Sequence, residues 1–98
     1  MLEQSTPLNN DWQGRRKLEE FFIATGFHDL LPLALEIAGS LGYDPTEMIE
    51  AICKVNDKFS QYPPTRNRTA WFLKVFEEKL SEARGDILTY RAKMKYFE

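Results

Sequence analysis

The sequence predicts an all-α fold, a four-helix orthogonal or bundle-like domain whose last helix is much the longest. Apolar residues recur along the chain at steps of three or four, which is the spacing of one face of a helix. No segment combines the alternating pattern of a strand with the turn residues of a hairpin. The connections between the predicted helices are short, about three to eight residues, as in helical bundles. A chain of 98 residues is expected to form one domain with one core.

The first helix is expected over residues 12–25, after a polar and weakly ordered lead-in over residues 1–10. Asp11 is a candidate N-cap, because a short side chain with an oxygen can accept a hydrogen bond from a free amide of the first turn. Gly26 is expected to end the helix in the left-handed conformation that glycine adopts easily. Residues 11–98 would then form the helical domain.

Two shorter helices are expected next. Asp29 is a candidate cap for a helix over residues 30–41, which is apolar on nearly every side and is therefore predicted to be the buried, central helix. Asp44 and Glu47 have the spacing of a capping box at the start of a helix over residues 45–60.

The last helix is predicted over residues 67–95, after the break at Pro63-Pro64. Its apolar stripe keeps its phase through Gly85, which predicts one continuous helix. Such a helix is about 40 Å long, at about 1.5 Å per residue, and the other helices are not expected to cover its far half. The apolar side chains left uncovered would form a protein interface, with Leu80, Ile87, Leu88, Met94 and Phe97 as its residues.

Most enzyme classes lack support in this sequence. The single histidine, His28, lies in a turn and is expected at the surface. There is no Cys or His cluster with metal-ligand spacing and no glycine-rich phosphate loop, so we expect no catalysis, metal, cofactor or small-molecule substrate. Cys53, predicted to be a small buried residue, has no cysteine partner, and neither a signal peptide nor a membrane span is evident. The expected location is the cytoplasm, with no membrane contact.

Charge is distributed unevenly between the two parts of the chain. Residues 1–60 have a net charge of −5 and residues 61–98 a net charge of +3. This asymmetry is typical of a chain that binds a nucleic acid or an acidic partner, or of two halves that attract each other. A helix start rich in arginine can hold a phosphate, and alternating bases and aromatic residues in the last turns suit single-stranded nucleic acid. The nucleic-acid candidates are Arg66, Asn67, Arg68, Lys74, Arg91, Lys93 and Lys95.

These residues also allow structural interpretations. Thr65 or Asn67 can be the N-cap of the last helix, and the two arginines can pair with the acidic first half. The aromatic and basic end can dock on a protein partner, or its long side chains can cover apolar surface while their charges stay in water.

A resemblance to known proteins covers about a third of the chain. The segment Pro63-Pro64-Thr65-Arg66-Asn67-Arg68-Thr69-Ala70-Trp71-Phe72, with residues 78–84 and 86–88, resembles the C-terminal helical tails of replication-associated proteins of bacterial plasmids and phages, including those with DnaD-like modules. The resemblance implies a nucleic-acid-related role on a bacterial mobile element. Such proteins usually carry a winged-helix or helix-turn-helix part, which this sequence does not show.

Two hypotheses follow from the sequence. The first is a non-enzymatic helical protein-interaction module, self-associating through the far half of the last helix. The alternative is a nucleic-acid-binding accessory domain of a plasmid or phage replication or regulatory protein.

Overall fold

Helices account for nearly all of the chain that the structure describes. The structure, a computed structural model, describes the backbone of residues 6–96 and the side chains of residues 14–93. Within these residues there is no strand, and the all-α prediction is confirmed. The elements in order are α1 (Thr6–Thr25), the short 3-10 helix η2 (His28–Leu30), α2 (Leu31–Leu41), α3 (Pro45–Gln61) and α4 (Arg68–Tyr96).

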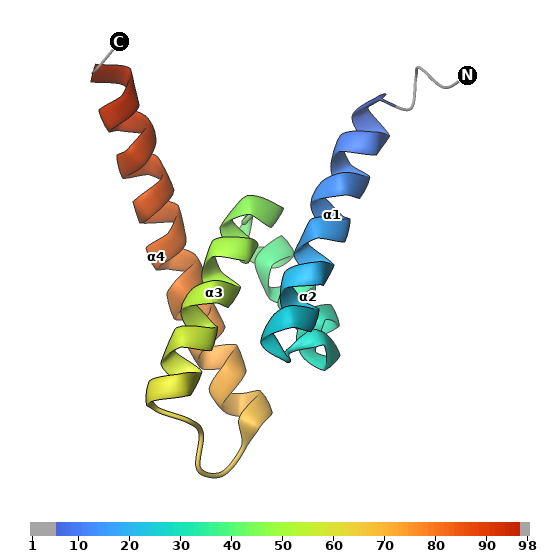
Figure 1. Cartoon of the computed structure of the whole chain (residues 1–98), viewed down its shortest axis with the longest axis vertical. Coiled ribbons are helices and arrows are strands. Elements are labelled where there is room, and N and C mark those ends of the chain that lie inside the picture. Colours follow the sequence, from blue (N-terminus) through green and yellow to red (C-terminus); the bar gives the residue numbers. More distant parts are fainter. Residues whose placement is uncertain (1–5, 97–98) are drawn as a thin grey trace.

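Helix α3 is the central helix, because it packs against both α1 and α4 (Figure 1). The prediction that residues 30–41 form the buried centre is wrong. Helix α2 buries Leu31, Ala34 and Ala38 on one side, but Leu33 and Leu41 are exposed on its other sides. The sequence suggested burial all round because α2 is rich in apolar residues, and the fold covers only one of its faces.

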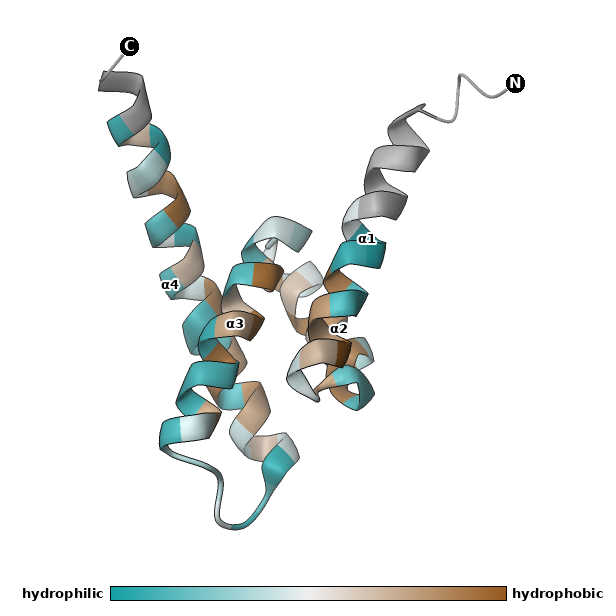
Figure 2. Cartoon of the chain, in the orientation of Figure 1, coloured by the Kyte–Doolittle hydropathy of each residue, from teal (hydrophilic) through white to brown (hydrophobic). Residues whose placement is uncertain are grey.

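An aromatic cluster joins α1, the turn after it, and α4. The ring of Phe72 stacks on Phe76, with centroids 5.1 Å apart and planes 12° from parallel. Phe22 meets both rings edge-on, at centroid distances of 6.3 and 6.1 Å, and Phe27 lies 5.2 Å from Phe72. All four rings are buried. Apolar segments of α1, α3 and α4 lie in the part of the fold where the helices come together (Figure 2). Burying such side chains supplies the main free energy of folding.

Most of the predicted helix ends are confirmed. Gly26 and Gly42 have φ angles of 84° and 80°, in the left-handed region that a glycine adopts without strain. At the start of α3, the amide of Glu47 donates to Asp44 Oδ1 at 2.8 Å, and the amide of Asp44 donates to Glu47 Oε1 at 2.9 Å. This reciprocal pair is the predicted capping box. Helix α4 is continuous through Gly85, also as predicted.

One predicted helix start and one predicted cap are wrong. Helix α1 begins at Thr6, so residues 6–10 are helical and Asp11 lies inside the helix. Pro7 fits a first turn, because the amide that it lacks would have no partner there. Residues 1–5 lie outside the described part of the chain. Asp29 does not cap α2, which follows Leu30 without a side-chain cap, because Asp29 instead binds Arg68.

Leu80 is also corrected, from interface residue to core residue. It has no exposed surface and belongs to the same buried cluster as Phe76 and Ala83. Helix α3 extends far enough along α4 to cover this position, as the ion pair between Lys54 and Asp86 at 2.9 Å illustrates.

This difference between Leu80 and Leu88 is measurable. We expect Leu80→Ala to lower the free energy of unfolding by about 2–5 kcal/mol, because it leaves a cavity in the core. Leu88 is 55% exposed, and Leu88→Ala should change that free energy by no more than about 0.5 kcal/mol. Urea unfolding followed by circular dichroism gives both values. Equal losses for the two variants would contradict this placement of the core.

Candidate interaction surface on helix α4

Arg84 attaches helix α4 to the corner between α2 and α3. Its Nε donates to Glu47 Oε2 at 2.7 Å and its Nη2 donates to Glu47 Oε1 at 2.9 Å, so the two side chains form a bidentate pair. The same Nη2 donates to the carbonyl of Gly42 at 2.7 Å. The guanidinium carbon lies 4.2 Å from the centre of the Tyr43 ring, within the range of a cation–π contact.

Arg68 makes an equivalent attachment one corner earlier in the chain. Its Nη1 donates to Asp29 Oδ2 at 2.9 Å, and its Nη2 donates to the carbonyl of Gly26 at 2.7 Å. The guanidinium carbon lies 4.8 Å from the centre of the Phe27 ring. In both cases the arginine binds the carbonyl of a left-handed glycine, the ring of the next residue and a nearby carboxylate. The two contacts fix the position of α4 along its proximal half.

The pKa values of Glu47 and Asp29 are both lowered by the arginine that each one binds. The hydrogen bond from Arg84 holds the pKa of Glu47 below its ordinary value of 4.5, with a smaller contribution from the amide of Asp44, while burial opposes the shift. The hydrogen bond from Arg68 likewise lowers the pKa of Asp29. These carboxylates therefore have a structural role, because their ion pairs attach α4 to the rest of the fold.

Beyond Arg84, α3 no longer covers the face of α4 that it buries in the core. We call residues 87–93 the tip of α4. The stripe that runs through the buried residues Leu80 and Ala83 continues at steps of four and three with Ile87, which is half-buried, and Tyr90, which is 63% exposed. Leu88 lies beside it on the surface. Helices α3 and α4 run in opposite directions, so the start of α3 at Pro45 lies nearest the tip. The tip projects past it (Figure 1).

An open cavity of about 430 Å³ lies where the cover ends. It is lined from α3 by Thr46 and Glu50 and from α4 by Asp86, Ile87 and Tyr90. Its lining is therefore an apolar stripe flanked by two carboxylates. Farther along the tip, Arg91 and Lys93 are exposed, and no acidic residue occurs between positions 87 and 96. The surface thus changes from acidic to basic along a few turns of helix.

The predicted interface residues are only partly brought together. Ile87 and Leu88 lie on the tip, whereas Leu80 is buried in the core. Met94 lies outside the residues whose side chains the structure describes, and Phe97 lies outside the described residues altogether. Tyr90 was missed, although its position in the three-four spacing of the stripe was a readable signal.

The predicted nucleic-acid residues do not form one surface. Asn67 caps α4, its Oδ1 accepting from the amide of Ala70 at 2.9 Å, and Arg68 is engaged as described above. Arg66 and Lys74 are exposed near this proximal end, and Arg91 and Lys93 near the distal end. About 35 Å of helix separates Arg68 from Arg91, at about 1.5 Å per residue. The side chain of Lys95 lies outside the described residues.

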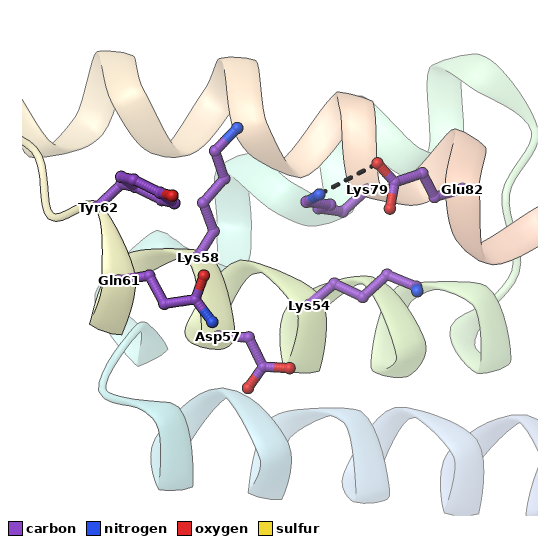
Figure 3. A pocket seen from close by; sticks show the side chains of 7 residues that line it. All are labelled: Lys54, Asp57, Lys58, Gln61, Tyr62, Lys79 and Glu82. Atoms are coloured by element: carbon purple, nitrogen blue, oxygen red, sulfur yellow. Dashed lines mark hydrogen bonds and ion pairs between the residues drawn. The ribbon is translucent and has the colours of Figure 1, made fainter.

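A polar groove of about 320 Å³ runs between α3 and α4, and sequence analysis did not find it (Figure 3). Its three lysines have acidic partners: Lys54 binds Asp86 at 2.9 Å, and Lys58 binds Glu78 at 3.3 Å. Lys79 binds Glu82 at 3.1 Å, the contact drawn in Figure 3. Two of these ion pairs join α3 to α4 and the third lies within α4, so each lysine of the groove already has an acidic partner.

The remaining reactive groups do not form a site. Cys53 is exposed, contrary to the prediction, because α3 buries Ala51, Ile52 and Val55 and turns position 53 outward. Partial burial raises the pKa of its thiol, with added effects of Glu50 and Asp57. His28 lies at the surface, as expected, with Nε2 3.2 Å from Glu19.

Two general surveys of the described residues are negative. They contain no group of three or more His, Cys, Asp or Glu side chains placed to hold a metal ion. None of the helices, over the part of the chain that is described, has the length and apolar character needed to cross a membrane.

In comparisons with known proteins, no family model, no curated protein and no solved structure matches this chain.

The pairing of Glu47 with Arg84 predicts a loss of stability in acid. The folded pKa of Glu47 is lowered, so its contribution is fully present above about pH 4.5 and is lost as the pH falls through the folded pKa. Glu47→Gln keeps the side-chain oxygen needed for the cap but removes the charge. We expect this variant to be less stable at pH 7 and to lose less stability than the wild type between about pH 5 and pH 3.

Urea unfolding across this pH range gives the comparison, with Glu50→Gln as the control on an exposed acid of the same helix. If Glu47→Gln and the wild type lose equal stability in acid, the pair with Arg84 is not a folding contact.

Proposed function

We propose that this chain is a non-enzymatic helical protein-interaction module, which self-associates through the tip of α4. The proposal depends on one observation: the apolar stripe of α4, which α3 buries in the core, continues past the end of α3. The stripe passes from Leu80 and Ala83 in the core to Ile87 and Tyr90 outside it. An amphipathic helix gains free energy when it buries such a face, and among the residues that the structure describes no other helix covers the tip.

The attachment of α4 supports this role. Arg84 lies less than one turn before Ile87, and its contacts with Glu47 and Gly42 fix the helix just where it leaves the core. A tip held in one orientation loses little conformational entropy when it binds a partner. The first turns of α1 diverge from the tip (Figure 1).

A cytoplasmic location is part of the proposal. Cys53 is a free, exposed thiol, a state that the reducing cytoplasm maintains.

Binding of nucleic acid is the second candidate, and the exposed bases Arg91 and Lys93 favour it. Its support is weaker, because Arg68 and Asn67 use their side chains within the chain. The segment that resembles plasmid and phage replication-associated tails also contains core residues, including Phe72. The relationship to those proteins stays a hypothesis attached to this second candidate.

The mass in solution tests self-association. By multi-angle light scattering from about 10 µM to about 1 mM, we expect a monomer that converts to a dimer, in high salt as well as low salt. Tyr90→Asp should weaken dimerisation at least about tenfold, because it places a charge within an apolar contact. Tyr62→Asp is the matched control, since Tyr62 is 67% exposed and lies at the far end of α3, and should leave dimerisation unchanged.

A wild-type chain that stays monomeric throughout would overturn self-association. Steeply salt-dependent binding of a single-stranded oligonucleotide by that monomer would favour the second candidate.

A further inference from the structure

We propose that the cavity at the base of the tip binds the side chain of an arginine from another protein. The ligand is a guanidinium group on an apolar stem, and the receiving groups are the ring of Tyr90 and the carboxylate of Glu50. This inference goes beyond the proposed self-association and does not depend on it. It adds a site of defined chemistry beside the surface that self-association uses.

The cavity is lined by residues of two helices. Thr46 and Glu50 are four residues apart, so both lie on one face of α3, and Asp86 and Tyr90 have the same spacing on α4. Ile87 completes the lining of this cavity of about 430 Å³. Ile87 and the ring of Tyr90 supply apolar surface, and the two carboxylates supply negative charge. The lining therefore suits a side chain that is apolar along its length and positive at its end.

Glu50 is the carboxylate that is available to a ligand. It is exposed and makes no hydrogen bond or ion pair with any residue that the structure describes. Asp86, by contrast, pairs with Lys54 at 2.9 Å, so its charge is already compensated within the chain. The charge of Glu50 has no such partner, and electrostatic complementarity therefore favours a cationic ligand.

The chain itself shows what fills a site that combines a ring with a carboxylate. Arg84 lies over the ring of Tyr43, 4.2 Å from its centre, and pairs with Glu47. Arg68 makes the same two kinds of contact at the preceding corner, 4.8 Å from the centre of the Phe27 ring. In both places a guanidinium lies on an aromatic face while its N–H groups donate to a carboxylate. The cavity offers the same two groups, and no arginine of the described part of the chain lines it.

The shape of the guanidinium group favours arginine over lysine. A flat guanidinium can lie on the ring of Tyr90, which is 63% exposed, while its N–H groups point at Glu50. The apolar stem behind it contacts Ile87. Lysine carries a compact charge without a flat face, so it can use the carboxylate but stacks less well on the ring.

The position of the cavity favours a side chain from another protein over one from a second copy. Helix α3 forms one wall of the cavity through Thr46 and Glu50, so a second α4 laid along the cavity would meet α3. A loop or an extended segment that presents a single arginine needs much less space. We therefore assign the ligand to a protein with an exposed arginine in such a segment.

Binding of N-acetylarginine amide to the full chain tests the inference. Heteronuclear NMR of the labelled chain at about 20 µM, near the monomeric end of the range given above, should show saturable shifts around the cavity. We expect a dissociation constant of about 1–10 mM, because the probe has few atoms. The citrulline analogue has the same shape but no charge, and it should bind at least about tenfold more weakly.

Variants of the two receiving groups locate the site. Glu50→Gln and Tyr90→Leu should each weaken binding of the probe at least about threefold, because each removes one receiving group. Tyr90→Phe keeps the aromatic face and should bind within about twofold of the wild type. Glu36→Gln is the matched control, because Glu36 is an exposed acid on α2 outside the cavity, and it should leave binding unchanged.

The outcomes separate this inference from the proposed function. Equal binding of the citrulline analogue, or binding that Glu50→Gln leaves unchanged, would overturn the inference. Equal binding of N-acetyllysine amide would overturn the assignment to arginine, because the ring would then add nothing. If Glu50→Gln weakens self-association as much as it weakens binding of the probe, the arginine belongs to a second copy and the assignment to another protein is wrong. A wild type that stays monomeric but binds the probe as expected would overturn the proposed function and support this inference.

Discussion

One carboxylate, that of Glu47, connects three of the four helices. It accepts from the amide of Asp44 and so caps the start of α3, and it accepts from Arg84 on α4. Through the same arginine it is joined to the carbonyl of Gly42, which ends α2. A single buried charge would be costly, but a bidentate partner and a capping amide share this one. The direction of α4, and therefore the place to which its tip projects, depends on this contact.

The apolar residues of the tip continue the stripe that packs in the core. The stripe of α4 is apolar along its whole length because Phe72, Phe76 and Leu80 have to pack, and the same spacing continues to Ile87 and Tyr90. What changes along α4 is whether α3 covers the stripe. The first turn of α3 lies beside Ile87, and α3 does not extend beyond it along the tip. An exposed apolar surface therefore arises where a long helix extends beyond the shorter helix beside it.

The features that local chemistry determines were predictable from the sequence, and those that depend on distant neighbours were not. The capping box of Asp44 and Glu47 and the glycine stops involve residues close in the chain. The pairing of Arg68 with the acidic first half was one structural interpretation of the sequence, and its contact with Asp29 confirms it. The role of Arg84 was missed, although Gly26 and Gly42 are 16 residues apart and so are the two arginines. That equal spacing was a signal, but only the fold shows that each arginine reaches a glycine 42 residues earlier. Leu80 was misassigned because its burial depends on how far α3 extends along α4. Helix α2 was misassigned because only one of its faces is buried, and the helix that packs against it is α4.

The distance between two spin labels in the dimer tests the central claim most directly. With Cys53 replaced by serine, a single label is placed either at Thr89, on the tip, or at Glu77, which is exposed on α4 outside the tip. Pulsed electron paramagnetic resonance should give a short intermolecular distance for Thr89, comparable to the 8–10 Å between packed helices plus the length of the labels. For Glu77 we expect a longer distance than for Thr89. A shorter distance for Glu77 than for Thr89 would place the contact outside the tip, and the absence of any intermolecular distance at concentrations near 1 mM, about the weakest affinity of interest, would contradict self-association.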